Sequence, residues 1–222
     1  TNILGGNGMA YFSCAYSIFM PVYAISVTGL PIAVAKLVSE ANAKNDYKKI
    51  SEIKYTSLKL FLSAGLIFTI VVILISYPFC KFIANLTFAW PSVILIAPTI
   101  LISCITSVYR GYYEGLHNMY PTAISQIVES ITKIIFGLLF SYKSFEFLIY
   151  HPEITKNLKD FFKISSSENE IIYSISSAAA ISGITLSSLF GMLFMVLRSK
   201  SDKSAIKIRK SDNKSLYKSL IK

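Results

Sequence analysis

Three residues with charged or amide side chains stand within the mostly apolar stretch 121–142, and their types could bind a charged or sugar-bearing ligand. Gln126, Glu129 and Lys133 follow the spacing i, i+3, i+7, so a helix would place them on one face. Counted from Pro121, Glu129 lies about 12 Å along such a helix, near the middle of a bilayer core about 30 Å thick. An ionisable residue at that depth costs at least about 2.5 kcal/mol to insert and indicates a functional site. The alternative is a structural i, i+4 pair in which Glu129 and Lys133 neutralise each other.

Arg110 follows the uncharged run 82–109 and is a second cation that could meet a ligand. Its planar guanidinium could hold a phosphate through two parallel hydrogen bonds. An arginine at a helix end can equally snorkel to the lipid headgroups without any ligand. The neighbouring Gly111 and Gly115 form a GxxxG pattern, which is only a weak packing signal outside the deep apolar core.

Motifs of common enzymes are absent from the sequence. There is no HExxH, no GxSxG, no phosphate-binding P-loop and no GxGxxG that opens a helix. We therefore expect no catalytic residue, no metal and no cofactor, and an ATP-driven pump or a zinc protease is disfavoured. Cys14, Cys80 and Cys104 are widely spaced in or beside apolar runs, so we interpret them as small buried residues rather than disulfide or metal-binding partners.

Five long apolar runs must position these side chains. The chain is 53% hydrophobic and only 15% charged, whereas a soluble domain is usually about 25% charged. Roughly 20 apolar residues suffice for a helix to cross the bilayer. We therefore predict an all-α fold, a polytopic membrane helical bundle with five transmembrane helices. Their expected ranges are about 9–35, 57–84, 91–109, 121–142 and 171–197.

Basic residues gather in alternate loops and predict the orientation in the membrane. The segments 36–59, 110–120 and 198–222 hold sixteen Lys and Arg, whereas the segments on the other side hold four, all within 143–170. By the positive-inside rule the first group is cytoplasmic. The orientation in the membrane therefore accounts for the net charge of +10, and we expect no nucleic-acid partner. We expect a membrane domain over 1–197 and a basic cytoplasmic linker over 198–222, which could also touch anionic membrane lipids.

Two of the predicted helices have informative interiors. Gly29 and Pro31 stand late in the 9–35 helix, and a proline removes one backbone hydrogen bond, so we expect a kink or break near 28–31. Such a bend would either line a cavity or serve packing alone. The 171–197 helix is rich in Ser, Ala and Gly, which we interpret as a close-packing surface.

Four segments resemble a known family. They are GGNGMAY at 5–11, TGLPIAVAKLVSE at 28–40, RGYYEG at 110–115 and MYPTAISQIVE at 119–129. Together they are similar to the stage V sporulation protein B group, in the polysaccharide-transport branch of the multidrug/oligosaccharidyl-lipid/polysaccharide flippase superfamily. The resemblance covers nearly all of 1–142 in order. Lys133 stands where arginine is expected in that group, and Glu114 where glutamine is usual.

The resemblance implies two helical lobes that face each other across a central cavity, with about fourteen helices in total. By that resemblance this chain holds helices two to six and the link toward the second lobe, and it lacks the first helix and the second lobe. The implied substrates are undecaprenyl-linked sugars, including the lipid-linked peptidoglycan precursor.

These expectations favour a flippase of lipid-linked oligosaccharide or peptidoglycan precursor, multi-pass in the bacterial plasma membrane. Arg110 and Lys133 would contact the diphosphate, Gln126 and Glu129 the sugar or peptide, and Gly29 and Pro31 would form the bend. One alternative is a cation-coupled multidrug exporter of the same superfamily, in which Glu129 is the proton or sodium site. Another is a membrane enzyme or helper protein that acts on polyprenyl-linked sugars.

Overall fold

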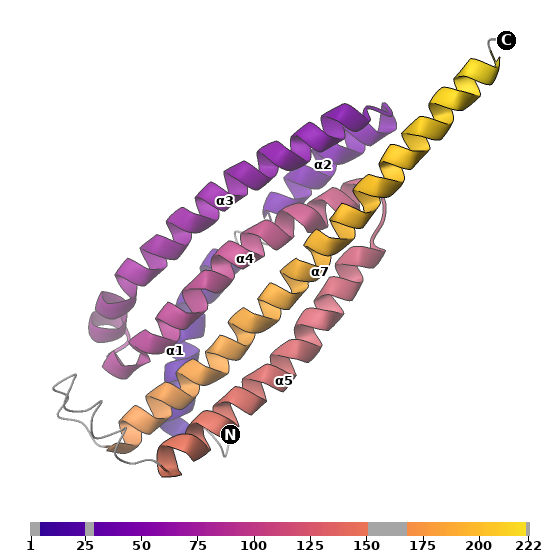
Figure 1. The fold of residues 1–222 in the computed structure, drawn as a ribbon. Coiled ribbons are helices and arrows are strands. Elements are labelled where there is room, and N and C mark those ends of the chain that lie inside the picture. Colours follow the sequence, from indigo (N-terminus) through magenta and orange to yellow (C-terminus); the bar gives the residue numbers. More distant parts are fainter. Residues whose placement is uncertain (1–4, 25–28, 151–167, 221–222) are drawn as a thin grey trace.

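A computed structural model describes residues 5–24, 29–150 and 168–220. Helices account for all the regular structure in these ranges, which confirms the all-α prediction (Figure 1). The elements are α1 (Gly5–Ala24), α2 (Leu30–Ala43), α3 (Tyr47–Pro78), a π-helical turn (Phe79–Ile83), a 3-10 turn (Thr87–Ala89), α4 (Trp90–Gly115), α5 (Tyr120–Tyr150) and α7 (Glu168–Leu220).

Four segments of the described residues are long and apolar enough to cross a bilayer. They are Tyr47–Ile83, Thr87–Gly115, Tyr120–Leu148 and Glu170–Lys200. The chain is thus a multi-pass membrane protein, as the sequence predicts. The predicted span at 9–35 is not among the four, because the structure divides that segment into α1 and α2, of 20 and 14 residues. Neither of these helices is both long enough and apolar enough.

The expected kink at 28–31 falls at the start of α2. Residues 25–28 lie outside the described part of the chain. Pro31 is buried in the first turn of α2, where its missing N–H costs no helical hydrogen bond. Gly29 has φ −80°, and a Cβ there would meet nothing within 4 Å among the described residues. Neither sterics nor backbone conformation therefore requires glycine at position 29, and the bending role of Gly29 and Pro31 stays a prediction.

The helices extend beyond the apolar windows that predict them. α3 begins at Tyr47 rather than near 57, because the side chain of Asp46 accepts a hydrogen bond from the backbone N–H of Lys49 at 3.1 Å and caps the helix. α5 continues to Tyr150, and α7 continues to Leu220 through most of the expected linker. Apolar windows mark the membrane-embedded part of a helix, whereas capping and local propensity decide where it ends.

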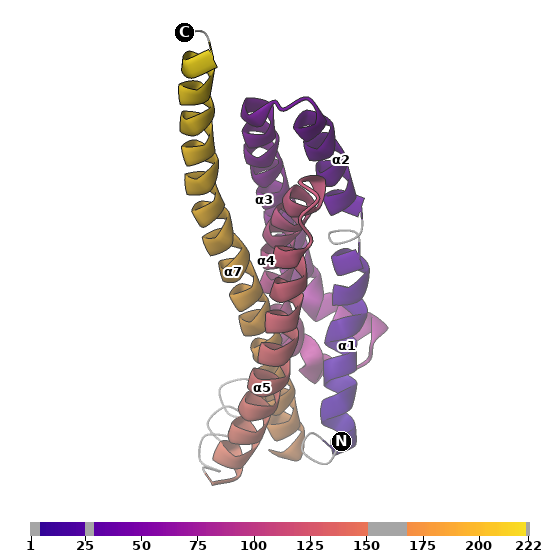
Figure 2. The same cartoon turned by 90° about the vertical axis from the view of Figure 1, so that its right-hand side faces the viewer.

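α4 lies at the centre of the bundle and contacts α1, α2, α3 and α7. α5 packs mainly against α7, at the edge (Figures 1 and 2). Ser92 of α4 and Ser177 of α7 share a hydrogen bond of 2.9 Å, and Ser174 donates to the carbonyl of Phe88 at 2.6 Å. The small-residue surface predicted on 171–197 therefore serves packing, as expected.

The GxxxG pattern at the end of α4 contributes more to packing than the sequence indicates. A Cβ at Gly111 would lie 2.5 Å from the carbonyl oxygen of Pro31, and one at Gly115 would lie 2.6 Å from the carbonyl oxygen of Ala35. Both glycines therefore let the backbones of α2 and α4 approach closely. This contact holds α2 against α4 beside Arg110.

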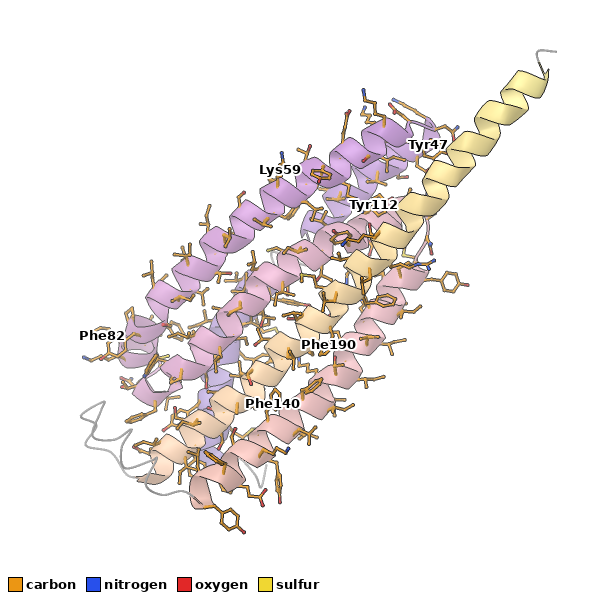
Figure 3. The ribbon with its side chains drawn as sticks, in the orientation of Figure 1. Tyr47, Lys59, Phe82, Tyr112, Phe140 and Phe190 are labelled. Atoms are coloured by element: carbon orange, nitrogen blue, oxygen red, sulfur yellow. The ribbon has the colours of Figure 1, made fainter. Side chains whose placement is uncertain are left out.

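α3 turns a broad apolar surface outward. Leu74 is 71% exposed and Ile67 is 61% exposed, in a window with mean hydropathy 2.6. Figure 3 shows Tyr47 and Phe82 at opposite ends of this helical segment. Water would not favour so much exposed aliphatic surface, so it suits contact with lipid tails.

The chain reversals lie at two opposite ends of the bundle. The turns α2–α3 and α4–α5 lie at the same end as the C-terminus, and the α3–α4 turn lies with the N-terminus (Figures 1 and 2). The segments expected to be cytoplasmic from their basic residues therefore share one end.

Candidate functional site

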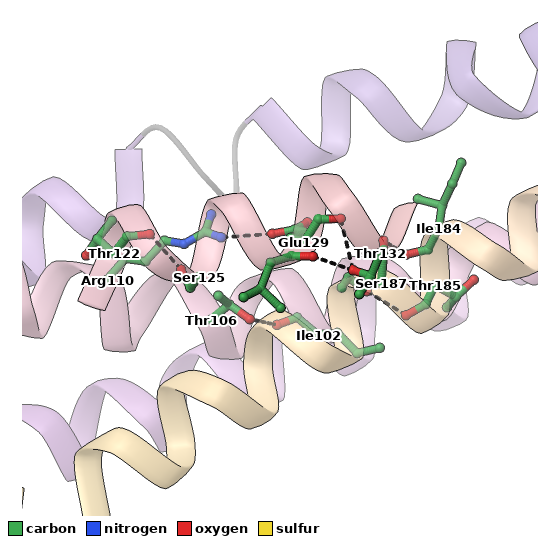
Figure 4. Close-up of polar contacts among 12 residues, drawn as sticks. Ile102, Thr106, Arg110, Thr122, Ser125, Glu129, Thr132, Ile184, Thr185 and Ser187 are labelled. Atoms are coloured by element: carbon green, nitrogen blue, oxygen red, sulfur yellow. Dashed lines mark hydrogen bonds and ion pairs between the residues drawn. The ribbon is translucent and has the colours of Figure 1, made fainter. Parts of the chain in front are cut away.

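An ion pair between α4 and α5 forms the centre of the candidate site. Arg110 donates from Nη2 to Oε2 of Glu129 across 2.9 Å (Figure 4). The side chain of Arg110 is 9% exposed and that of Glu129 is 25% exposed. Glu129 therefore pairs across two helices with Arg110, and not with Lys133 one turn along its own helix. Of the sequence-predicted site residues, the structure brings these two together.

Four helices supply the walls of a small pocket around this ion pair. They are α1, α4, α5 and α7, and the lining residues are Tyr23, Ser103, Thr106, Arg110, Glu129 and Ser188. Gly191 of α7 lies beside the glutamate, since a Cβ there would be 3.4 Å from Oε2 of Glu129, an ordinary contact distance. The pocket combines a cation, a carboxylate, a phenol and three hydroxyls, and in this conformation it has no interior space for a water molecule. The polar side chains of four helices therefore converge on the ion pair, and a ligand would reach it only if the helices moved apart.

Several polar atoms near the ion pair have no hydrogen-bond partner in the described part of the chain. They include Nε of Arg110, Oγ of Ser107 and Oγ1 of Thr122, all buried. By contrast, Oγ1 of Thr106 donates to the carbonyl of Ile102 at 2.9 Å, and Oγ of Ser125 donates to the carbonyl of Thr122 at 2.8 Å (Figure 4). A buried donor without a partner is costly, so such atoms indicate a place for water or a ligand.

Lys133 and Gln126 lie on α5 on either side of Glu129. Lys133 is exposed, and its Nζ lies 5.6 Å from the centroid of the Tyr16 ring on α1. Gln126 is exposed at the surface. The ammonium of Lys133 is thus directed across to α1, on the side where Tyr23 and Arg110 line the pocket, whereas Gln126 lies outside that pocket.

Sequence analysis missed the contributions of other helices to this site. Tyr16 and Tyr23 come from α1, and Ser103, Thr106 and Ser188 come from α4 and α7. Single hydroxyl or aromatic residues in an apolar run are common and carry no motif. Only the three-dimensional register of the helices shows that Tyr16 faces Lys133 and that the other four line the pocket of the ion pair.

A second buried cation lies near the end of the bundle that is expected to be cytoplasmic. Lys54 of α3 is 5% exposed, and its Nζ lies 4.8 Å from the ring centroid of Tyr109 and 4.5 Å from that of Tyr112. Its ammonium also donates to Oγ of Ser199 in α7. Two aromatic faces and a hydroxyl offset much of the cost of burying a charge. The sequence predicts Lys54 only as one of the loop cations in 36–59.

Comparison with known families bears on this arrangement. The family model described as polysaccharide biosynthesis protein matches residues 1–151. The chain belongs to that family. The matched region holds α1 to α5, and with them Arg110, Glu129 and Lys133. The resemblance predicted from the sequence is therefore confirmed at the level of the family.

Curated relatives of this family member come from Bacillus subtilis (strain 168). Stage V sporulation protein B is 31% identical over 59% of this chain and 25% of its own length. Lipid II flippase MurJ is 29% identical over 61% of this chain and 26% of its own length. An uncharacterized membrane protein, YabM, is 27% identical over 63% of this chain and 26% of its own length. The chain thus spans about a quarter of the length of these relatives, and no solved structure matches it significantly.

Proposed function

We propose that this member of the polysaccharide biosynthesis protein family forms part of a transporter that flips a lipid-linked oligosaccharide or peptidoglycan precursor across the bacterial plasma membrane. One similar protein is named as a lipid II flippase and another as a stage V sporulation protein. These names support a transport role, rather than an enzymatic one, in the synthesis of a cell wall or spore envelope.

The observation that carries this proposal is the Arg110–Glu129 ion pair within apolar helices. Charged side chains in a membrane are costly unless they pair or meet a hydrated cavity. Here they line a pocket contributed by four helices, and the ammonium of Lys133 lies nearby on α5. A polyprenyl diphosphate sugar has a charged head that needs such a polar surface, whereas its tail stays in lipid.

The ion pair gives a physical route to reversible binding. A diphosphate that approaches Arg110 competes with Glu129 for the same guanidinium, so the ligand is held without being trapped. Lys133 adds a second positive charge, and Gln126 at the exposed edge is suited to a hydrogen bond with a sugar. A bend at Gly29 and Pro31 would let one part of the lobe tilt during alternating access.

This proposal includes parts beyond the described helices. A first helix and a second lobe would complete the cavity, because alternating access needs two lobes that move against each other. Residues 198–222 would lie on the cytoplasmic side, near the anionic headgroups of membrane lipids. No nucleic acid, metal or cofactor has a role in this scheme.

A cation-coupled multidrug exporter is the second candidate, and the intramembrane carboxylate of Glu129 favours it. An ion-coupling carboxylate must release its partner in order to take up a proton or sodium ion. The 2.9 Å contact with Arg110 occupies the carboxylate, so a coupling ion would first have to displace the guanidinium. We therefore prefer the lipid-linked sugar as the substrate.

Complementation tests the proposal. The complete reading frame that contains this chain would be expressed in a bacterium depleted of its own lipid II flippase. We expect growth and precursor flipping to be restored. The control is Lys143→Ala, which changes an exposed lysine near the far end of α5 and should restore both equally. Failure of the well-expressed protein to restore flipping of any polyprenyl-linked sugar would refute the proposal.

A further inference from the structure

Four aromatic rings form a continuous ladder along one face of α1. Phe12, Tyr16, Phe19 and Tyr23 are spaced i, i+4, i+7 and i+11. The ring centroids are 4.8 Å apart from Phe12 to Tyr16, 5.9 Å from Tyr16 to Phe19 and 5.0 Å from Phe19 to Tyr23. These distances are typical of aromatic contacts, so each ring positions the next.

The ladder differs from an ordinary core stripe in its exposure. Phe19 is only 5% exposed, whereas Phe12, Tyr16 and Tyr23 are partly accessible. Two of these three are tyrosines, which offer an apolar face and a hydroxyl together. The ladder therefore has a buried anchor at Phe19 and accessible rings on both sides of it.

Both tyrosines of the ladder lie next to the charged groups of the candidate site. The ammonium of Lys133 lies 5.6 Å from the centroid of the Tyr16 ring, and Tyr23 lines the pocket with Arg110 and Glu129. Along the helix the two tyrosines are seven residues apart, or about 10 Å. The charges and the ring faces thus form one elongated surface rather than two separate features.

Resting on the proposed function, we propose that this ladder is the surface that recognises sugar rings, with Tyr16 as the residue that distinguishes a sugar-bearing lipid from a bare polyprenyl diphosphate. An aromatic face is negatively polarised and attracts the weakly positive C–H groups of a sugar ring, as it attracts an ammonium. A phosphate next to Lys133 forms a stronger, charge-assisted contact than the ring does. Phosphate binding therefore draws Lys133 from Tyr16 and frees that ring face for the sugar.

Binding of two defined lipids separates the roles of Tyr16 and Lys133. Purified protein from the complete reading frame would be titrated with undecaprenyl diphosphate and with undecaprenyl diphosphate linked to N-acetylglucosamine. We expect Tyr16→Leu to weaken binding of the sugar-bearing lipid about five- to tenfold and to change binding of the bare lipid less than twofold. Tyr16→Phe retains the ring and should bind both lipids nearly as the parent does. Lys133→Gln should weaken binding of both lipids by a similar factor.

A matched control and a second variant keep the test decisive. Tyr142→Leu alters an exposed tyrosine on α5 outside the ladder and should change neither affinity. Tyr16→Trp preserves a large ring and adds a fluorophore. Its emission should change with both lipids as Lys133 leaves the ring, and should shift further with the sugar-bearing lipid than with the bare lipid. This variant also serves if Tyr16→Leu does not fold.

The outcomes distinguish this inference from the function on which it rests. If the parent protein binds neither lipid, the proposed function is wrong and the sugar surface with it. A second case is that the parent binds the sugar-bearing lipid, but Tyr16→Leu weakens binding of both lipids equally or weakens binding of neither. The ladder is then a packing element, and this inference alone is overturned. An identical response of Tyr16→Trp to both lipids would overturn it in the same way.

Discussion

A Cβ at Gly183 of α7 would lie 2.6 Å from the backbone nitrogen of Gly137 in α5. The two backbones touch at this point, and α5 has few contacts with the rest of the bundle apart from α7. The position of α5, and of Glu129 and Lys133 on it, therefore depends on Gly183, which carries no chemistry of its own.

Replacement of Gly183 should loosen α5. Gly183→Ala forces the two backbones apart, and overpacking of this kind costs about 1–3 kcal/mol. We expect a lower midpoint of thermal unfolding in detergent. Gly137→Ala is the matched control on the facing helix, because a Cβ there would lie 3.8 Å from the carbonyl oxygen of Ala180, an ordinary contact distance. Equal stability of the two variants would contradict the close contact.

The Arg110–Glu129 pair should show coupling in a double-mutant cycle. Arg110→Gln leaves the carboxylate of Glu129 without its cation, and we expect a loss of about 1–3 kcal/mol, since Glu129 is partly exposed. Combining Arg110→Gln with Glu129→Gln should recover part of this loss. Chemical unfolding of all four proteins measures the coupling, and strictly additive effects would mean that the pair contributes nothing.

Transport should depend on the charge of Lys133. Lys133→Ala should impair flipping of a polyprenyl-linked sugar about tenfold or more, and Lys133→Arg should keep most activity, because a phosphate needs a cation there. Normal flipping by Lys133→Ala at matched expression would remove Lys133 from the site.

Glu129→Gln separates the two candidate transport functions. If Glu129 only competes with the ligand for Arg110 and hydrogen-bonds a sugar, the Glu129→Gln variant should retain part of its flipping activity. A cation-coupled exporter should lose its dependence on the ion gradient altogether. Flipping or export would be followed in vesicles with and without an imposed gradient.

Topology can be measured on the described turns. In a background with Cys14, Cys80 and Cys104 replaced, Lys44→Cys lies on the turn between α2 and α3, and Thr87→Cys lies on the α3–α4 turn. An impermeant thiol reagent added to intact cells should label Thr87→Cys and not Lys44→Cys, because the basic segments are expected inside. The reverse pattern would invert the orientation.

Sequence reasoning predicted the fold class, four of the spans and the family, because apolar length and loop charge are strong local signals. It missed that Glu129 pairs with Arg110 rather than Lys133, since a helix repeat describes neighbours on one helix only. It also underestimated Gly111, whose contact with Pro31 depends on how α2 returns against α4. Partners across helices depend on packing geometry, which no single segment encodes.

The contact of Lys54 with Ser199 also has a mechanical meaning. α7 has 53 residues, or about 80 Å of continuous helix, and crosses a hydrocarbon core of only about 30 Å. Ser199 is 21 residues, about 30 Å, from Leu220. About 30 Å of helix therefore continues beyond the contact with α3, so a tilt of α7 about that contact would displace its far end the most.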